Sequence, residues 1–300
     1  MSVLAESLVK RGGPRGSEVR EMYMGAFMLK KKFGADNVFD LSIMNPVMEP
    51  PKEFFDELKR LADNPVKGAH RYMMHPGFHE TRVAVAEQIK AETGIDISFE
   101  NITITSGCSS SLSVTFKVLL NPGEEVVIFT PFWGGYRNYV TSYGGVPKII
   151  PTNEEFMPDL DLLEKTLSPK TKAVVINSPN NPSGAVIDED TLAKMGELLG
   201  QKEKEYGTTI FLVSDQVYSK IMFDGKKFPQ PMKYQPNTII VTSHSKDLSL
   251  AGERIGHIAV NPESEHAKKL GNFLGNSLRS GGNNASALMQ RIVSKLQNVS

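Results

Sequence analysis

Five short runs of β-branched and other apolar residues recur along the chain, and stretches with helical periodicity lie between them. The runs cover residues 101–107, 124–131, 172–179, 208–215 and 238–245. Each run is apolar at successive positions, which is typical of strands that are buried on both faces of a sheet. Because parallel strands need long crossover connections, helices are expected between them. The sequence therefore predicts a three-layer α/β/α fold with a mainly parallel mixed sheet.

Seven stretches carry apolar residues at spacings near 3.6, the period of an amphipathic helix. They cover residues 18–34, 54–64, 79–94, 110–121, 188–207, 265–278 and 285–298. The last stretch reaches almost to the end of the sequence without a glycine or proline stop signal. We therefore expect the sequence to stop inside a helix.

Charge and cysteine content restrict the class of partner and the compartment. The chain has 34 basic and 34 acidic residues, so it lacks the broad positive field that nucleic acids or anionic membranes attract. No apolar run reaches the roughly 18 residues that span a membrane, and Glu6 and Lys10 interrupt the position of a signal peptide's apolar stretch. The only cysteine, Cys108, favours a reducing compartment. We expect a cytoplasmic protein with small-molecule ligands.

Polar side chains follow the predicted strands at the points where they end. In open α/β sheets, ligands bind beyond the carboxyl ends of the strands. After the first run, Ser106, Gly107, Cys108 and Ser109 open a helix, and the free N–H groups and positive dipole end of such a helix suit a phosphate. A plain serine-rich helix cap is the alternative interpretation.

A ring, an amide, a carboxylate with a phenol, and an amine with a guanidinium follow the other four runs. These groups belong to Trp133, Asn181, Asp215 with Tyr218, and Lys246 with Arg254. Taken singly, such a tryptophan is more often a core residue, the asparagine part of a turn, the aspartate a structural cap and the lysine a solvated charge. Their convergence at one edge of the sheet is what indicates a shared ligand.

Pyridoxal 5'-phosphate requires this combination of groups. It needs a lysine for a Schiff base, a carboxylate facing the pyridine nitrogen, and donors for its phenolate oxygen and phosphate. Asp215 would keep the ring nitrogen protonated, and Asn181 and Tyr218 would donate hydrogen bonds to the phenolate. Arg254 would offer the phosphate a planar fork of donors. We therefore expect pyridoxal phosphate to be the cofactor.

The motifs SPNNPSG, DQVY, SHSK and AGERIG together resemble those of the class I/II aminotransferases, in the fold-type I superfamily of pyridoxal phosphate-dependent enzymes. The resemblance runs from about Leu41 to about Gln290. It implies an aminotransferase that moves an amino group between an L-amino acid and a 2-oxo acid through a Schiff base on Lys246. It also implies a homodimer with shared active sites.

The resemblance assigns a role to each residue of the site. Lys246, Asp215 and Tyr218 match the catalytic residues. Trp133 matches the aromatic residue that stacks on the cofactor ring, and Tyr72 matches a tyrosine that the family lends to the phosphate in the neighbouring subunit. The residues that match the family's cofactor contacts are Tyr72, Gly107, Cys108, Ser109, Trp133, Asn181, Asp215, Tyr218, Ser243, Ser245, Lys246 and Arg254.

The substrate contacts depart from the family pattern. Met44 stands where the family usually has a glycine that helps position the substrate carboxylate, and Asn45 beside it is the candidate contact. The family's carboxylate-binding arginine lies well over a hundred residues beyond the lysine, and this sequence ends earlier. We expect a fragment of a longer protein, with a rebuilt substrate site as the alternative. Arg279 is the candidate partner for a dicarboxylic substrate, or else a solvated arginine.

The same resemblance implies a division into three parts. Residues 1–45 would form an N-terminal arm and the start of a small domain. Residues 46–280 would form the large cofactor-binding domain, and residues 281–300 the start of an incomplete C-terminal small domain.

Three other functions use the same residues. A C–S lyase and an aspartate decarboxylase would use the same lysine and cofactor, so the motifs do not separate them from a transaminase. A non-catalytic cofactor-binding protein is the third alternative. No metal site is expected at His70, His75 and His79, because Pro76 and Gly77 break the helix that would align them.

Overall fold

The computed structural model describes residues 16–280 and 284–299. The chain divides into two compact units, Met1–Val47 and Met48–Ser300. In the first unit, the helix α2 (Gly16–Phe33) is followed by the short 3₁₀ helix η1 (Ala35–Asn37). Lys30 of α2 forms a salt bridge with Asp40 at 2.8 Å. The predicted division at residues 45 and 280 stays a prediction.

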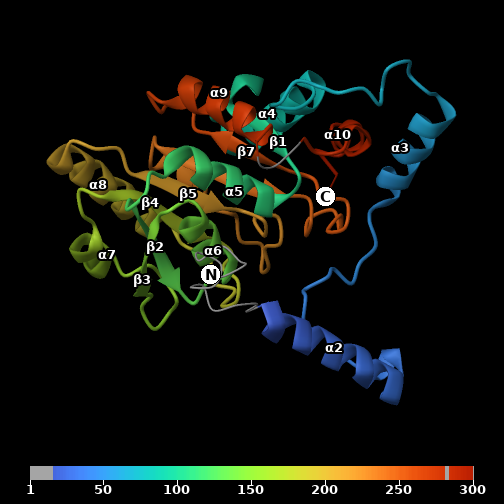
Figure 1. The fold of residues 1–300 in the computed structure, drawn as a ribbon, viewed down its shortest axis with the longest axis horizontal. Helices are drawn as coiled ribbons and strands as arrows, with labels where there is room; N and C mark the ends of the chain where they lie inside the picture. The colour runs from blue at the N-terminus through green and yellow to red at the C-terminus, as the bar shows by residue number, and fades with distance from the viewer. Residues whose placement is uncertain (1–15, 281–283, 300) are drawn as a thin grey trace, which may run out of the picture. The chain divides into compact units, whose positions relative to one another are not determined.

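Seven strands of the described residues form one sheet in the second unit (Figure 1). The strands are β1 (Ile102–Thr105), β2 (Glu125–Thr130), β3 (Val146–Pro151), β4 (Thr171–Asn177), β5 (Phe211–Asp215), β6 (Thr238–Ser243) and β7 (Gly256–Val260). Their order is β1-β7-β6-β5-β4-β2-β3. Strand β7 runs antiparallel to both of its neighbours, and the other pairs are parallel. The predicted mainly parallel mixed sheet is confirmed.

Helices cover both faces of the sheet and complete the three layers (Figure 1). Successive residues of β2 show the division: Val126 and Ile128 pack with α5, α6 and α9, whereas Val127 and Phe129 pack with α7 and α8. On that second face, α4 and α10 pack with β1, β6 and β7, and α3 packs against α10. The helices are α3 (Lys52–Asp63), α4 (His79–Thr93), α5 (Cys108–Leu119), α6 (Gly135–Ser142), α7 (Leu160–Thr166), α8 (Glu189–Tyr206), α9 (Ala267–Leu278) and α10 (Ala287–Val293), with 3₁₀ helices η2 (Phe99–Asn101) and η3 (Pro231–Lys233).

Two of the strands were not predicted from the sequence. β3 contains Pro147 and Pro151, and it occupies the edge of the sheet, where a missing N–H is tolerated. β7 begins with Gly256 and His257, which interrupt the apolar pattern of a doubly covered strand. Both segments therefore lack the local signal that identified the other five.

The last predicted helix, over residues 285–298, is shorter in the structure. α10 ends at Val293, and Lys295 and Leu296 then donate i→i−3 hydrogen bonds that tighten the backbone into turns. The expectation that the described chain stops inside a helix is therefore wrong. None of the helices in the described ranges is both long and apolar enough to cross a membrane.

Candidate cofactor-binding site

The antiparallel strand β7 brings the ends of β1 and β6 close together. Gly256, its first residue, is paired with Thr105 on one side and with Ser243 on the other. A Cβ built at Gly256 would lie 2.9 Å from Cβ of Ser243 and 3.0 Å from Cα of Gly107, and it would also meet the carbonyl oxygen of Thr242. Glycine at this position therefore allows the two strand ends to approach each other.

Gly107 and Arg254 lie together at the N-terminal end of α5, where the guanidinium adds a positive charge. Gly107 has φ +86°, and a Cβ there would lie 2.8 Å from Nη2 of Arg254. The guanidinium therefore lies against the backbone that leads into Cys108 and Ser109, the first two residues of α5. Its Nη1 donates to the carbonyl oxygen of Ala251 at 2.9 Å, which leaves other guanidinium donors for a ligand.

Ser243 and Ser245 add hydroxyl groups at the end of β6. Both serines are buried, and Oγ of Ser243 donates to Oγ of Ser245 at 3.0 Å. Lys246 follows in the turn after β6 and is half-buried, and burial lowers the pKa of its ammonium group. The turn thus presents hydroxyl groups beside an amine that loses its proton more readily than a lysine in water.

Asp215, the last residue of β5, is a buried carboxylate with 4% of its surface exposed. Its described donors are neutral groups: the Tyr136 hydroxyl at 2.6 Å, the Val217 N–H at 3.2 Å and the Cys108 thiol at 3.6 Å. Burial raises the pKa of Asp215, and the three hydrogen bonds oppose that rise without cancelling it. This carboxylate can therefore gain considerable stability from a cation placed against it.

The sequence motifs give no role to Tyr136 or to the Cys108 side chain. Burial, followed by the nearby Asp215 charge, raises the pKa of both groups well above their ordinary values, so both remain protonated donors. Tyr136 lies three residues after Trp133. Nothing in its position along the sequence indicates a hydrogen bond to Asp215 at the end of β5. The contact is visible only in three dimensions.

Asn181 and Tyr218 lie side by side, with Nδ2 of Asn181 donating to the Tyr218 hydroxyl at 3.4 Å. Asn177, which the sequence analysis missed, explains the placement. Its Oδ1 accepts a hydrogen bond from the Asn181 N–H at 2.7 Å, and its Nδ2 donates to the Asp215 carbonyl oxygen at 3.1 Å. One buried amide thus ties the loop after β4 to the end of β5.

Trp133 is not a core residue. It keeps 38% of its surface exposed, and its ring makes an edge contact with that of Tyr136, at 5.6 Å between centroids and 86° between planes. The indole therefore remains available as a stacking surface next to the residue that donates to Asp215.

Three further residues were predicted from the sequence. Tyr72 is fully exposed on the loop before α4, and Arg279 is exposed at the end of α9. Asn45 belongs to the first unit. Their roles stay predictions.

Relatives in curated collections share the sequence pattern of this chain. It is 35% identical over 193 residues to the probable aspartate/prephenate aminotransferase of Thermus aquaticus, covering 64% of this chain and 49% of that protein. It is 30% identical over 247 residues to the probable aspartate aminotransferase of Methanocaldococcus jannaschii, covering 82% of this chain and 61% of that protein. The chain therefore spans about half to three fifths of the length of these relatives.

Solved structures share the fold. An amino transferase from Eubacterium rectale superposes with a TM-score of 0.94 at 34% identity, over 100% of this chain and 76% of that one. An aspartate aminotransferase from Thermus thermophilus, solved with maleate, superposes with a TM-score of 0.83 at 26% identity, over 99% of this chain and 73% of that one. The family model for aminotransferase class I and II matches residues 36–299. The chain belongs to the class I and II aminotransferase family.

Proposed function

We propose that the protein transfers an amino group between an L-amino acid and a 2-oxo acid, with pyridoxal phosphate held at the strand ends described above. The observation that carries this proposal is the burial of Asp215 among neutral donors. A buried carboxylate without a cation is unfavourable, whereas a protonated pyridine nitrogen would compensate its charge. Lys246 lies at the same edge of the sheet, since β5 and β6 are parallel neighbours.

The donor set fits this cofactor at its other end as well. The Arg254 guanidinium, the N-terminus of α5 and the hydroxyl groups of Ser243 and Ser245 are the kinds of donor that bind a phosphate dianion. Asn181 and Tyr218 would donate to the phenolate oxygen. When bound, pyridoxal phosphate supplies an electron-withdrawing ring that stabilises negative charge on the α-carbon of the substrate.

Lys246 would move the proton in this reaction. Because burial lowers its pKa, a larger fraction of the amine is uncharged near neutral pH than in water. An uncharged amine could take the α-proton of the substrate and then return it to the C4′ carbon of the cofactor, on the other side of the amino nitrogen, acting first as base and then as acid. Asp215 would hold the ring nitrogen in its protonated state, and Trp133 would offer the ring a stacking surface.

The phosphate contact makes a specific prediction for Gly107→Ala. The new methyl group would lie within 2.8 Å of Arg254 Nη2, on a backbone with φ +86° that disfavours alanine. We expect the dissociation constant for pyridoxal phosphate to rise by about tenfold or more, because a charged hydrogen bond is worth about 1.5–3 kcal/mol. Equilibrium dialysis measures it. Gly94→Ala, also at positive φ but with open space around it, is the matched control. Equal affinities for both variants would contradict the assignment.

Arg279 would select dicarboxylic substrates such as aspartate or glutamate. The names of the Thermus aquaticus and Methanocaldococcus relatives include aspartate, and maleate, a dicarboxylate, was solved with the Thermus thermophilus enzyme. These names support a dicarboxylic substrate, and the role of Arg279 in binding it is part of the proposal.

The experiment that tests the function is a half-reaction screen of the cofactor-loaded protein with aspartate, glutamate, alanine and phenylalanine, and with a cysteine S-conjugate as the substrate for a lyase. A transaminase converts the bound cofactor to pyridoxamine phosphate and releases the matching 2-oxo acid. A lyase or decarboxylase regenerates pyridoxal phosphate instead and releases ammonia or carbon dioxide. No spectral change with any amino acid would indicate a non-catalytic binding protein. Each of these other outcomes would overturn the proposal.

The same screen with Arg279→Ala tests the substrate class. We expect rates with the dicarboxylates to fall about 10²-fold and rates with alanine and phenylalanine to change little, because only the former would lose a charged partner. Arg137→Ala removes another arginine as a control. A uniform loss for all four substrates, or no loss, would show that Arg279 does not read the side chain.

Two further parts of the proposal concern assembly and location. We propose a homodimer in which Tyr72 reaches the phosphate in the neighbouring subunit, which its full exposure on a loop permits. An active monomer in sedimentation at assay concentration would contradict this. A cytoplasmic location is supported by the single cysteine, and fractionation of the source cells tests it.

A further inference from the structure

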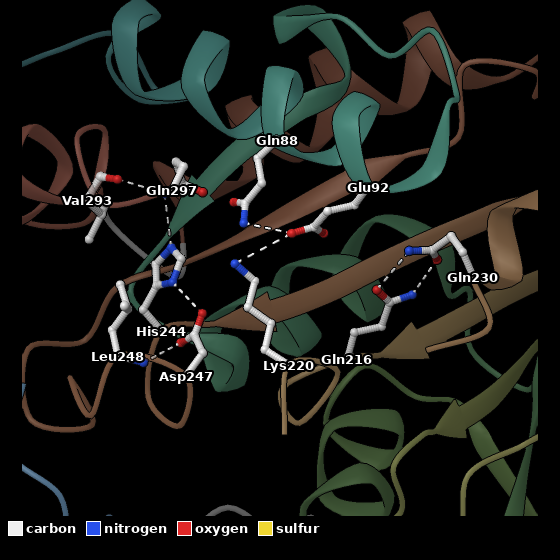
Figure 2. A network of polar contacts seen from close by, with 10 residues as sticks. All are labelled: Gln88, Glu92, Gln216, Lys220, Gln230, His244, Asp247, Leu248, Val293 and Gln297. Atoms are coloured by element: carbon white, nitrogen blue, oxygen red, sulfur yellow. Dashed lines mark hydrogen bonds and ion pairs between the residues drawn. The ribbon is translucent and has the colours of Figure 1, made fainter. Parts of the chain in front are cut away.

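A second group of polar side chains lies on the face of the sheet opposite to Asp215. Along β6, Ile239 and Val241 pack with α5 and α9, whereas Ile240 packs with α4 and α10. Thr242 and His244 therefore point to the α4 side, and they line a cavity of about 50 Å³ together with Glu92, Lys220 and Asp247. Figure 2 shows His244 with Glu92, Lys220 and Asp247 of this group. A space of this size holds a few waters and excludes a cofactor.

His244 and Asp247 bracket Lys246 in a four-residue turn. The His244 ring Nδ1 lies 3.0 Å from Oδ2 of Asp247 (Figure 2), and Oδ1 of Asp247 accepts a hydrogen bond from the Leu248 N–H at 2.9 Å. The backbone of His244 is held at both ends, because its N–H donates to the Ile255 carbonyl oxygen and its own carbonyl oxygen accepts from the Leu250 N–H. The side-chain bridge therefore closes the turn on the face away from Ser243 and Ser245.

The hydrogen bonds of Gln297 determine the tautomer of His244. Nε2 of Gln297 donates to the Val293 carbonyl oxygen at 2.7 Å and lies 3.4 Å from Nε2 of His244 (Figure 2). In the opposite amide orientation, Oε1 of Gln297 would lie 2.7 Å from the Val293 carbonyl oxygen, and two acceptors repel each other at that distance. The amide nitrogen therefore faces the ring, so Nε2 of His244 is the acceptor, and Nδ1 carries the proton that is donated to Asp247.

The surrounding charges keep Asp247 ionised as the acceptor. Burial would raise its pKa, but the His244 ring, the Lys220 charge and the Leu248 N–H outweigh burial, and the pKa is lowered. Lys220 is held 3.6 Å from Glu92 on α4. His257, on the neighbouring strand, stays neutral because burial and the nearby His244 lower its pKa to about 3. The bridge is thus an imidazole Nδ1–H that donates to a carboxylate.

We propose that His244 and Asp247 are positioning residues for Lys246, with Gln297 fixing the tautomer that makes the bridge. This inference rests on the proposed role of Lys246. On the cofactor side, the turn is held by the Ser243–Ser245 bond, and on the reverse side by the His244–Asp247 bridge. Breaking the bridge should let the lysine amine sample positions away from the cofactor carbonyl, while the phosphate donors remain in place.

The test separates attachment of the cofactor from its binding. Each variant is mixed with pyridoxal phosphate, quenched with borohydride at increasing times, and the modified Lys246 peptide is measured by mass spectrometry. The dissociation constant of pyridoxine phosphate, which lacks the aldehyde and cannot attach, is measured in parallel. The variants are His244→Ala, His244→Asn, whose amide N–H can still reach Asp247, and Asp247→Leu. Gln230→Ala, which removes a member of the same polar group away from the turn, is the control.

We expect His244→Ala and Asp247→Leu to attach the cofactor about 10²-fold more slowly, the loss that a displacement near 1 Å can cause. His244→Asn should recover most of the rate, Gln230→Ala should match the wild type, and all should bind pyridoxine phosphate with wild-type affinity. Wild-type attachment rates in His244→Ala and Asp247→Leu, or no recovery in His244→Asn, would overturn the proposal. If His244→Ala fails to fold, the comparison of His244→Asn with Asp247→Leu decides.

A cofactor-free measurement distinguishes failure of this inference from failure of the proposed function. Hydrogen exchange of the Leu250 amide, which donates to the His244 carbonyl oxygen, reports opening of the turn in the apo protein. It should be at least about tenfold faster in His244→Ala than in His244→Asn, since closing the turn prevents local opening. If the wild type never attaches cofactor at Lys246, the proposed function fails. Equal exchange rates in the two variants contradict the bridge itself.

Discussion

Lys246→Ala is expected to reduce turnover by at least about 10⁴-fold while pyridoxal phosphate still binds. The substitution removes both the amine that would attach the cofactor and the group that would move the α-proton. It leaves Asp215 and the phosphate donors around Arg254 unchanged. The cofactor should therefore remain bound through its ring nitrogen and phosphate.

The measurement combines steady-state turnover, cofactor content after gel filtration, and borohydride labelling. The wild type should carry the label on Lys246 only. Lys233→Ala, at an exposed lysine of η3, serves as the control and should keep full turnover and labelling. A label on another lysine, or substantial turnover in Lys246→Ala, would sink the assignment.

Asp215→Asn is expected to slow the proton-transfer step by about 10²- to 10³-fold, the usual loss when a well-placed electrostatic group is removed from an active site. An amide is close in size to the carboxylate and can keep a hydrogen bond from Tyr136, but it cannot stabilise a protonated pyridine. The burial of this residue makes the loss larger, because charges interact more strongly away from water.

Single-turnover kinetics with α-deuterated and ordinary amino acid measure this step. The deuterium isotope effect should increase in Asp215→Asn, because proton transfer becomes more completely rate-limiting. Tyr136→Phe removes the hydroxyl that donates to Asp215 at 2.6 Å but keeps the carboxylate charge. Proton transfer should therefore slow less in this variant than in Asp215→Asn. Near-normal single-turnover rates in Asp215→Asn would refute the role of the charge.

The sequence alone determined the layers of the fold and the residues that collect at one edge of the sheet. Continuous apolar runs identified β1, β2, β4, β5 and β6, because a strand that is buried on both faces has no polar alternation. The position of Asp215 and Lys246 after such runs followed from the same pattern, since parallel strands end at one edge. Local sequence patterns are sufficient to predict the strands and the residues that follow them, because strand formation depends mainly on residues that are neighbours in the chain.

Only the tertiary structure decided which groups meet. Strand β7 inserts antiparallel between β1 and β6, and its Gly256 lets their ends approach, yet its short sequence carries no strand signal. The donors to Asp215 from Tyr136 and Cys108 lie 79 and 107 residues away in the chain. The tautomer of His244 depends on Gln297, which is 53 residues away. Hydrogen bonds of this kind form between side chains of elements that only packing brings together, so no spacing along the sequence records them.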